Sequence, residues 1–234
     1  MLKTLIIIPT YNERDNISKL INDIFNLSIK DLGILVVDDN SPDGTGQLVE
    51  KLKQRYANLN ILHRPIKEGL GKAYLDGFKE ALNRKVDYIF EMDGDLSHDP
   101  KYIPIFLNTI KEVDLVLGSR YIKNGGVDNW NLTRRLVSRF GNIYARIVLN
   151  LPYRDLTGGF KCYRRKVLEN INLDSLSSVG YNFQIETTYK VYLAKFKIKE
   201  IPIIFTERKT GVSKFNFKII LESFWRVLKL RFEK

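Results

Sequence analysis

With 234 residues, of which 44% are hydrophobic and 12% are aromatic, the chain can bury a substantial core in one domain or in two joined lobes, which excludes a disordered tail. Its single cysteine, Cys162, excludes an internal disulfide and a cysteine-cluster metal site, and the presence of only two histidines disfavours zinc. The net charge is +11, and no run approaches the roughly 18 apolar residues of a membrane-spanning helix, so we expect a protein that is soluble or attached to a membrane surface.

The first half of the sequence alternates short apolar runs with amphipathic segments. Strands are predicted at the apolar runs, over residues 2–8, 33–39, 59–63, 87–93 and 114–119. Helices are predicted where apolar residues recur at helical spacing, over residues 13–27, 44–56, 71–82 and 101–111. Strands that are apolar on both faces and alternate with helices are typical of right-handed βαβ units in a parallel sheet covered on both sides. The predicted fold class is therefore α/β, with a mostly parallel central sheet flanked by helices.

The second half is less regular and strongly basic. Helices are predicted over residues 133–150, 182–194 and 215–232. Strands are predicted over residues 158–165 and 197–205. No repeat or long linker separates the halves, so we expect them to share one sheet. Residues 1–118 carry a net charge of −3, whereas residues 119–234 carry +14. This asymmetry indicates an anionic partner for the second half, such as a phosphate, a lipid headgroup or a nucleic acid, although a solvated basic surface has the same composition.

Polar residues follow the predicted strands of the first half. In parallel α/β sheets, ligands bind beyond the carboxyl ends of the strands, so the residues that follow each strand are candidates for a binding site. These segments are Pro9–Glu13, Asp38–Ser41, residues 93–99 and Gly118–Arg120. Each is polar, and most are acidic or turn-forming. We therefore expect the functional site at this edge of the sheet.

The segment EMDGDLSHD, residues 91–99, carries the strongest chemical signal, because one glycine separates Asp93 from Asp95. On an extended segment, side chains two residues apart project to the same side and can bind one ion. Two hard oxygen ligands suit Mg²⁺ or Mn²⁺, which keep positions open for water and for substrate phosphates. Gly94 permits a tight bend and the close approach of a ligand. The motif is short, and a solvated turn after a strand is the alternative.

Eight motifs occur in the order and spacing of one enzyme family. They are IIIPTYNERDNI, LVVDDNSPDGTG, EGLGKAYLDGF, EMDGDLSHDP, VLGSRYIKNGGVDNW, DLTGGFKCYRR, GYNFQIE and ERKTGVSKF. From Thr4 to about Phe215, the chain thereby resembles the polyprenol-phosphate mannosyltransferases, also called dolichol-phosphate mannose synthases. The resemblance implies an inverting family 2 glycosyltransferase with the GT-A fold. It further implies one GT-A domain over residues 1–214, with a nucleotide-sugar-binding half (1–118) and an acceptor-binding half (119–214), followed by a helix over 215–234.

The resemblance assigns contacts with the donor nucleoside and diphosphate to seven residues. They are Pro9, Tyr11, Glu13, Asp38, Asp39, Arg208 and Lys214. The first three belong to the loop after the first strand, and the aspartate pair is expected beside the base and the ribose. The two cations belong to a basic loop that closes on the diphosphate.

The resemblance also assigns a metal site. Asp93, Gly94 and Asp95 match the acidic motif of the family, in which the two carboxylates bind a divalent cation and the donor diphosphate. In some members, a glutamine two residues after the second aspartate also contacts the metal. Here that position is Ser97, so water can replace a third protein ligand.

The acceptor side of the site is basic. Arg120, Arg134 and Ser138 resemble the residues around the acceptor phosphate of the family. That phosphate is already largely ionised at neutral pH, since its second pKa is about 6, so no side chain needs to act as a general base. Catalysis is expected to consist of positioning and charge neutralisation, with the metal-binding pair and the two arginines as the catalytic residues. Asp155 lies near the position of the base in related enzymes with hydroxyl acceptors, and we assign it a structural role.

The last predicted helix is amphipathic. Its apolar stripe consists of Ile220, Leu221, Phe224, Trp225, Leu228 and Phe232. The predicted polar side consists of Lys218, Glu222, Arg226 and Lys229. Such a helix suits the interface of an anionic membrane, and ordinary packing against the protein is the alternative. Some relatives continue into transmembrane helices at this point. This chain is therefore expected to bind the membrane surface alone, to use a separate membrane subunit, or to be part of a longer protein whose transmembrane segments have been removed.

These observations predict an enzyme that transfers mannose from GDP-mannose to a polyprenyl phosphate at the cytoplasmic membrane face, with Mg²⁺ or Mn²⁺. Transfer of glucose from UDP-glucose is the second hypothesis. A sugar nucleotidyltransferase is a third, but it favours a glycine-rich basic loop after the first strand, where this chain has Pro9–Glu13. A nucleic-acid-binding protein would explain the basic half and would need no divalent cation. We expect no nucleic-acid partner.

Overall fold

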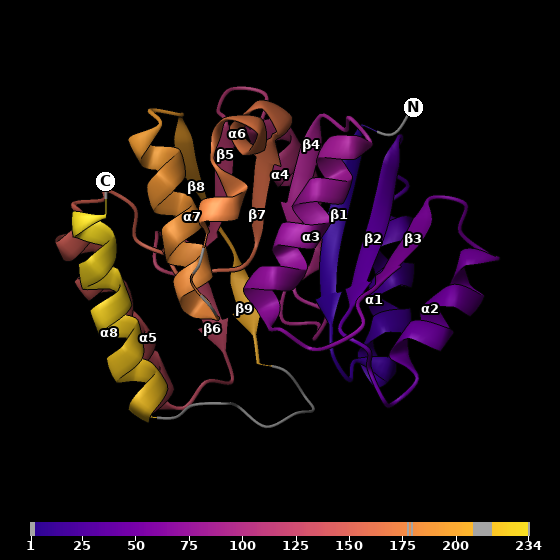
Figure 1. Cartoon of the computed structure of the whole chain (residues 1–234), viewed down its shortest axis with the longest axis horizontal. Coiled ribbons are helices and arrows are strands. Elements are labelled where there is room, and N and C mark those ends of the chain that lie inside the picture. Colours follow the sequence, from indigo (N-terminus) through magenta and orange to yellow (C-terminus); the bar gives the residue numbers. More distant parts are fainter. Residues whose placement is uncertain (1–2, 177, 179, 208–216, 234) are drawn as a thin grey trace.

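Seven strands form the central sheet, in the order β3-β2-β1-β4-β7-β5-β8 (Figure 1). The structure is a computed structural model that describes residues 3–176, 178, 180–207 and 217–233. The strands of the sheet are β1 (Thr4–Thr10), β2 (Leu32–Asp38), β3 (Leu59–His63), β4 (Tyr88–Glu91), β5 (Leu115–Ser119), β7 (Lys161–Arg164) and β8 (Ile198–Pro202). All run in one direction except β7, which is antiparallel to both of its neighbours, β4 and β5. The fold is a mostly parallel α/β sheet, as predicted.

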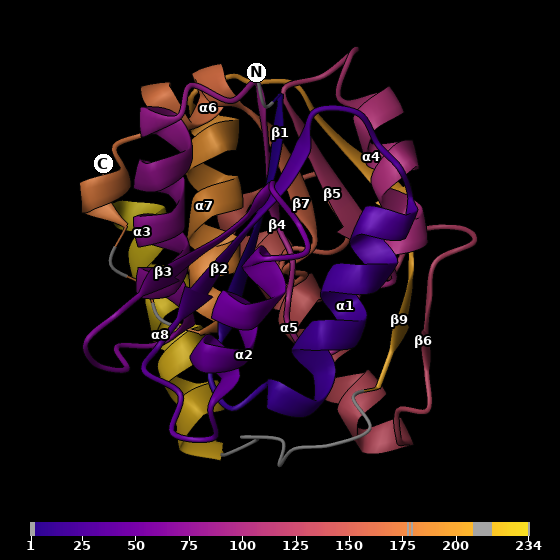
Figure 2. The same cartoon turned by 90° about the vertical axis from the view of Figure 1, so that its right-hand side faces the viewer.

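Helices cover both faces of this sheet (Figure 2). They are α1 (Arg14–Asn26), α2 (Thr45–Lys53), α3 (Leu70–Asn83), α4 (Ile103–Thr109), α5 (Leu132–Leu149), α6 (Arg165–Asn170), α7 (Tyr181–Leu193) and α8 (Phe217–Phe232). Successive strand residues point to opposite faces. In β1, Leu5 and Ile7 therefore pack with α3, α6 and α7, whereas Ile6 and Ile8 pack with α1, α2 and α4. This double burial explains why the strands are apolar on both sides.

Two helices lie outside these layers. The long helix α5 packs against α8, and both contact α7 through a third, smaller apolar cluster (Figure 1). This cluster contains Ala145, Leu149, Leu151, Leu156, Ile185, Tyr189, Val227 and Leu230. A short parallel pair is formed by β6 (Gly126–Asp128), which comes before α5 in the chain, and β9 (Ile204–Thr206), which comes before α8. The basic half thus adds a helical layer to the end of the shared sheet.

Most predicted elements agree with the structure to within a few residues, and strands of both halves share one sheet. The predicted strand over 197–205 is divided, because β8 ends at Pro202 and β9 begins at Ile204. The sequence analysis missed β6, α6 and two short 3₁₀ helices, Pro100–Tyr102 and Leu173–Ser175. These elements are too short to show a periodic pattern. None of the described helices is long and apolar enough to cross a membrane.

The faces of α8 differ from the prediction. Val227 and Leu230 are buried, whereas Trp225 of the predicted apolar stripe is 73% exposed. Arg226, which was predicted on the polar side, instead points into the protein and pairs with Glu186 of α7, with 3.2 Å between Nη2 and Oε1. The helix therefore packs against its neighbours, as one of the two alternatives expects, and it also presents exposed apolar side chains on its outer face.

Candidate functional site

The carboxyl ends of the parallel strands lie together at one edge of the sheet, at the lower side of Figure 1. The N-terminal ends of α3 and α7 lie at the same edge. Because β7 is antiparallel, its beginning reaches this edge as well: a methyl group added to Gly159 would lie 3.3 Å from Oδ1 of Asp93, which follows β4. The edge therefore gathers residues from both halves of the chain.

Asp93 and Asp95 lie on a bent loop and not on an extended segment as predicted. Oδ1 of Asp95 accepts a hydrogen bond from the backbone N–H of Ser97, at 3.1 Å, and Leu96 has a positive φ of 64°. Oδ1 of Asp93 accepts a hydrogen bond from the hydroxyl of Tyr74 on α3, at 3.2 Å. The Asp93 side chain is 29% exposed, so it is both held in place and accessible.

The residues present fit a hard divalent cation. Among the described residues, no group of three or more His, Cys, Asp and Glu side chains could enclose a metal, which disfavours a closed protein site. Two carboxylates that leave most positions to water and phosphate are typical of Mg²⁺ or Mn²⁺. Beside them, the buried Oγ of Ser97 has no hydrogen-bond partner in the described part of the chain. Gly94 lets the loop lie against β1, because a methyl group there would be 3.3 Å from the carbonyl oxygen of Pro9.

His98 supports this loop, a role that the sequence analysis missed. Its buried Nδ1 accepts a hydrogen bond from the backbone N–H of Asp93, at 3.1 Å, and its Nε2 lies 3.8 Å from Oδ2 of the same residue. The ring stacks on Phe160 and contacts Phe205 edge-on. Burial lowers the pKa of His98, against the opposing effect of Asp93 and Asp95, so the neutral ring is favoured. His98 thus orients the backbone at the start of the acidic motif.

A buried polar network lies directly behind the acidic motif. Nζ of Lys161 on β7 donates to the carbonyl oxygen of Gln184 at 2.8 Å and to the hydroxyl of Thr188 at 3.0 Å. The hydroxyl of Tyr163 donates to Glu91 at 2.8 Å. Burial raises the pKa of Glu91, although Lys161 acts in the opposite direction, and burial lowers the pKa of Lys161 to about 8. The network ties β4, β7 and α7 together beneath the site.

Asp38, which was predicted beside the nucleoside, fixes the loops at the ends of β1 and β2. Its carboxylate is 2% exposed and accepts hydrogen bonds from the hydroxyl of Thr10 at 2.8 Å and from the hydroxyl and the backbone N–H of Ser41. Oγ of Ser41 in turn accepts from the backbone N–H of Asn12, at 3.1 Å. The described contacts of Asp38 therefore hold the strand ends in register.

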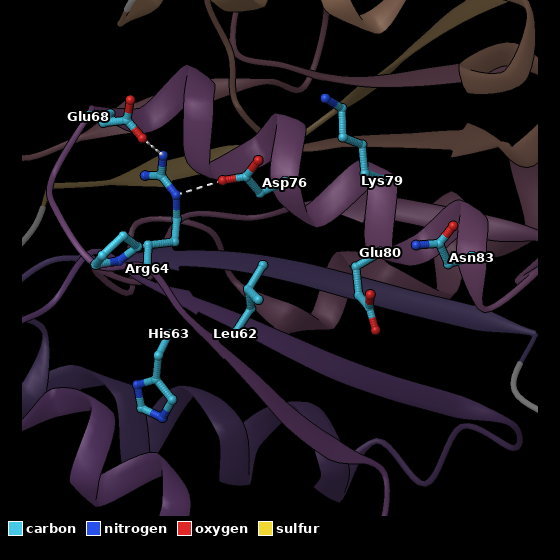
Figure 3. Close-up of a pocket in the computed structure, with 9 residues that line it drawn as sticks. Leu62, His63, Arg64, Glu68, Asp76, Lys79, Glu80 and Asn83 are labelled. Atoms are coloured by element: carbon cyan, nitrogen blue, oxygen red, sulfur yellow. Dashed lines mark hydrogen bonds and ion pairs between the residues drawn. The ribbon is translucent and has the colours of Figure 1, made fainter.

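Asp39 pairs with a buried arginine that the sequence analysis did not single out. Nη1 of Arg64 contacts Oδ1 of Asp39, and the same guanidinium donates to Glu68 at 2.6 Å and to Asp76 at 2.7 Å. Figure 3 shows Arg64 between Glu68 and Asp76 at a surface pocket of about 360 Å³ beside β3 and α3. The sequence could have indicated Arg64 through its position, because it directly follows β3 at the carboxyl edge of the sheet, where the other candidates were sought.

The loop after β1 contacts the segment before α3. Nζ of Lys67 lies 3.4 Å from the centre of the Tyr11 ring, which is the geometry of a cation–π contact. Glu13 accepts a hydrogen bond from the side chain of Asn16 at 2.8 Å, and its backbone N–H donates to the hydroxyl of Thr45. The predicted nucleoside residues thus come from loops that touch one another.

Arg120 forms a buried ion pair with Asp155. Its backbone N–H, Nε and Nη2 all donate to the two carboxylate oxygens, at 2.7–2.9 Å, and Nη2 also donates to Thr157. Burial opposes the charge on both groups, but the pairing prevails, so the pKa of Asp155 is lowered and that of Arg120 is raised. These contacts favour the structural role that we assigned to Asp155.

Two aromatic residues, Trp130 and Tyr121, connect the three predicted acceptor residues. The guanidinium carbons of Arg120 and Arg134 lie 5.6 and 4.2 Å from the ring centre of Trp130. Nη1 of Arg134 donates to Glu207 at 2.7 Å, and the hydroxyl of Tyr121 donates to Oγ of Ser138 at 2.7 Å. The three predicted acceptor residues thus form one patch.

The two cations predicted at the donor diphosphate, Arg208 and Lys214, lie outside the described residues. The site is accordingly defined here by its acidic loop, its nucleoside loops and its arginine patch. Buried polar atoms without a partner gather at its margins, since Ser97, Trp130 and Gln184 each have one or more within the described part of the chain.

Sequence comparison relates the chain to known proteins. Residues 5–171 match the model of glycosyl transferase family 2. A polyprenol monophosphomannose synthase from Mycolicibacterium smegmatis is 42% identical over 227 residues, covering 96% of this chain and 85% of the relative. An undecaprenyl-phosphate mannosyltransferase from Micrococcus luteus is 39% identical over 222 residues, covering 95% of this chain and 91% of the relative.

Structural comparison relates the fold to solved proteins. A glucosyl-3-phosphoglycerate synthase from Mycobacterium tuberculosis, solved with Mn²⁺, UDP-glucose and phosphoglyceric acid, has a TM-score of 0.71 at 15% sequence identity. The match covers all of this chain and 81% of that protein. The agreement shows that this chain has the same GT-A fold.

Proposed function

The chain belongs to glycosyl transferase family 2, and from this premise we propose that it transfers mannose from GDP-mannose to a polyprenyl phosphate, with inversion, at the cytoplasmic face of a membrane. The names of the two relatives, a polyprenol monophosphomannose synthase and an undecaprenyl-phosphate mannosyltransferase, support mannose as the sugar and a polyprenyl phosphate as the acceptor. The observation that carries the proposal is the acidic loop after β4, which faces a sheet edge that also holds a patch of arginines.

On the donor side, Asp93 and Asp95 would hold Mg²⁺ or Mn²⁺. The bound cation would neutralise the diphosphate as it leaves. Tyr74 and His98 keep the loop in position through the carboxylate and the backbone N–H of Asp93. The chain thus contributes a fixed pair of oxygen ligands whose geometry is established before the substrate arrives.

On the acceptor side, Arg134 and Ser138 would bind the phosphate of the polyprenyl chain, and Arg120 would add positive charge from behind. Arg134 now pairs with Glu207, and a phosphate would replace this partner with a stronger bidentate one. No described carboxylate is needed as a base, because the attacking phosphate oxygen is already ionised. Asp155 is unsuited to that task, since Arg120 donates to both of its carboxylate oxygens and thereby lowers its pKa.

The outer face of α5 and α8 supports contact with a membrane. Its large exposed side chains are Leu132, Leu136, Phe140, Ile143 and Ile147 on α5, and Trp225, Leu228 and Phe232 on α8. Exposed cations flank them at Arg135, Arg139, Arg146, Lys229 and Arg231. Apolar side chains with cationic flanks are typical of helices that lie in the interface of an anionic bilayer. This face would place the arginine patch near the membrane surface, where the acceptor phosphate lies.

Substitution of Phe140 by glutamate is expected to weaken binding to anionic lipid vesicles about tenfold or more. The ring is 61% exposed, so the change removes an apolar side chain worth about 1.5–3 kcal/mol in the bilayer without disturbing the core. Vesicle flotation measures the bound fraction. Ile105→Glu is the control, because Ile105 is 49% exposed on α4, outside this face. Equal losses for both variants would contradict the proposed membrane face.

Donor identity is tested by thermal unfolding with GDP or UDP and Mn²⁺, followed by transfer of labelled sugar to polyprenyl phosphate. At a hundredfold excess over its Kd, a ligand stabilises the native state by about 2.7 kcal/mol, which raises the Tm by roughly 5–10 °C. We expect this shift with GDP and label from GDP-mannose in the lipid. An increase of the Tm with UDP but not with GDP would favour the second hypothesis, transfer of glucose from UDP-glucose. Label in a pyrophosphate exchange product would indicate nucleotidyl transfer instead.

A further inference from the structure

The side-chain amide of Gln184 on α7 is buried next to the acidic motif. The residue is 1% exposed, and neither Nε2 nor Oε1 makes a hydrogen bond of normal geometry within the described part of the chain. The amide lies close enough to Glu91 to favour the ionised form of that carboxyl group, yet Oε2 of Glu91 also has no partner of normal geometry among the described residues. A buried polar group without a well-formed hydrogen bond is destabilising. A bound ligand that pairs with the amide would recover this free energy.

Gln184 lies close to Asp93 because the residue between them is a glycine. A methyl group at Gly159 would lie 3.3 and 3.4 Å from the carboxylate oxygens of Asp93 and 3.5 Å from Nε2 of Gln184. The amide of Gln184 and the carboxylate of Asp93 therefore approach the same point from two sides. The Asp93 side chain is 29% exposed, so a ligand can reach the carboxylate beside this amide.

We propose that Gln184 binds a hydroxyl group of the hexose that is transferred. This assignment rests on the proposed function, in which Asp93 and Asp95 hold the donor diphosphate to which the hexose is attached. The amide both donates and accepts hydrogen bonds, as a hydroxyl group does. A phosphate oxygen only accepts, so it would leave Oε1 unpaired, and the neighbouring carboxylate of Asp93 disfavours a second anion here. A neutral, hydroxyl-bearing group is the partner that satisfies both amide atoms.

Gln184→Met tests the assignment, because methionine keeps the length and apolar bulk of the side chain but removes its hydrogen bonds. Isothermal titration with Mg²⁺ gives the Kd of GDP and GDP-mannose, and of UDP and UDP-glucose. We expect the nucleotide sugar that the wild type binds to lose about tenfold or more in affinity, which is the effect of one or two neutral hydrogen bonds. The Kd of the corresponding nucleoside diphosphate is expected to change less than twofold. The control is Gln54→Met, an exposed glutamine that follows α2.

A structural role for Gln184 predicts a different result. If its amide serves only Glu91, then Gln184→Met lowers the Tm and weakens the nucleoside diphosphate and the nucleotide sugar equally, and the proposal is overturned. Unchanged affinity for the nucleotide sugar overturns it as well. If Gln184→Met does not fold, Gln184→Leu removes the same amide with a different apolar shape, and the same selective loss is expected. A wild type that binds neither nucleotide sugar would overturn the proposed function, and this assignment with it.

Discussion

Replacement of Asp93 or Asp95 by asparagine is expected to reduce sugar transfer by about three orders of magnitude. Each change removes one negative charge from a pair that would hold the cation at the leaving diphosphate, and loss of one such electrostatic contact typically costs 10²–10³-fold or more in rate. The fold should persist, because Asp93 is part-exposed and asparagine can still accept the hydrogen bond from Tyr74. Transfer of labelled mannose to polyprenyl phosphate measures the loss.

The matched control for this prediction is Asp99→Asn. Asp99 belongs to the same loop but caps the following 3₁₀ helix through the backbone N–H of Lys101 and pairs with that lysine at the surface. We expect its transfer rate to stay within twofold of the wild type. In addition, the increase of Tm that Mn²⁺ gives in the presence of GDP should vanish in Asp93→Asn and persist in Asp99→Asn. Near-normal transfer by both Asp93→Asn and Asp95→Asn would contradict the assignment of the acidic loop to the donor.

The second large effect concerns stability, and it arises at Asp155. Asp155→Ala leaves Arg120 as a buried charge without its carboxylate partner, and breaking a buried ion pair in this way lowers the free energy of unfolding by about 3–5 kcal/mol. For a chain of this size, the Tm should fall by roughly 10 °C. Thermal and urea unfolding measure the change. Glu80→Ala, which removes a partner from a surface pair with Arg84, should change the free energy of unfolding by less than about 1 kcal/mol.

A double variant distinguishes the contribution of the two charges to stability from the contribution of side-chain packing. Arg120→Met with Asp155→Leu removes both charges, and we expect it to be more stable than either single variant, since no unpaired charge remains buried. If the double variant is as unstable as the sum of the single ones, the two side chains contribute independently, and the ion-pair account is wrong.

The pH dependence of stability follows from the same pair. Although burial raises the pKa of Asp155, the charge and hydrogen bonds of Arg120 outweigh it and lower the folded-state pKa below its ordinary value. A carboxyl group with a lowered folded-state pKa stabilises the protein above its unfolded pKa of about 3.9, and this contribution is lost as the pH falls through the folded pKa. The difference in stability between wild type and Asp155→Ala should therefore be full at neutral pH and shrink below about pH 4.

The sequence predicts the layers of this fold well, because local patterns determine them. Leu5 to Ile8 are apolar without alternation, and a strand between two helical layers needs this pattern. The direction of β7 was not predictable in the same way, since its pairing with β4 depends on residues about 70 positions away in the sequence. Local sequence patterns predict whether a segment forms a helix or a strand. The neighbours and the direction of a strand depend on residues that are distant in the sequence.

The site shows the same division. Asp93 and Asp95 were selected as candidates because they follow an apolar strand. His98 and Arg64 were missed, since their contacts with Phe160 and Asp39 join residues that lie far apart in the sequence. For α8, periodicity identified a helix with an apolar side. It could not show that Arg226 would find Glu186 inside the protein, so part of the polar side was assigned wrongly.

The reversed direction of β7 has a practical consequence for engineering this molecule. The residues that lead into β7 lie beside Asp93, so new termini, inserted tags or fused domains between residues 157 and 161 would disturb the acidic loop of the candidate site. The turns at the opposite edge of the sheet, at residues 84–87, 111–114 and 194–197, connect elements without approaching the acidic loop. Fluorophores and affinity handles belong there, where they leave the reacting groups unhindered.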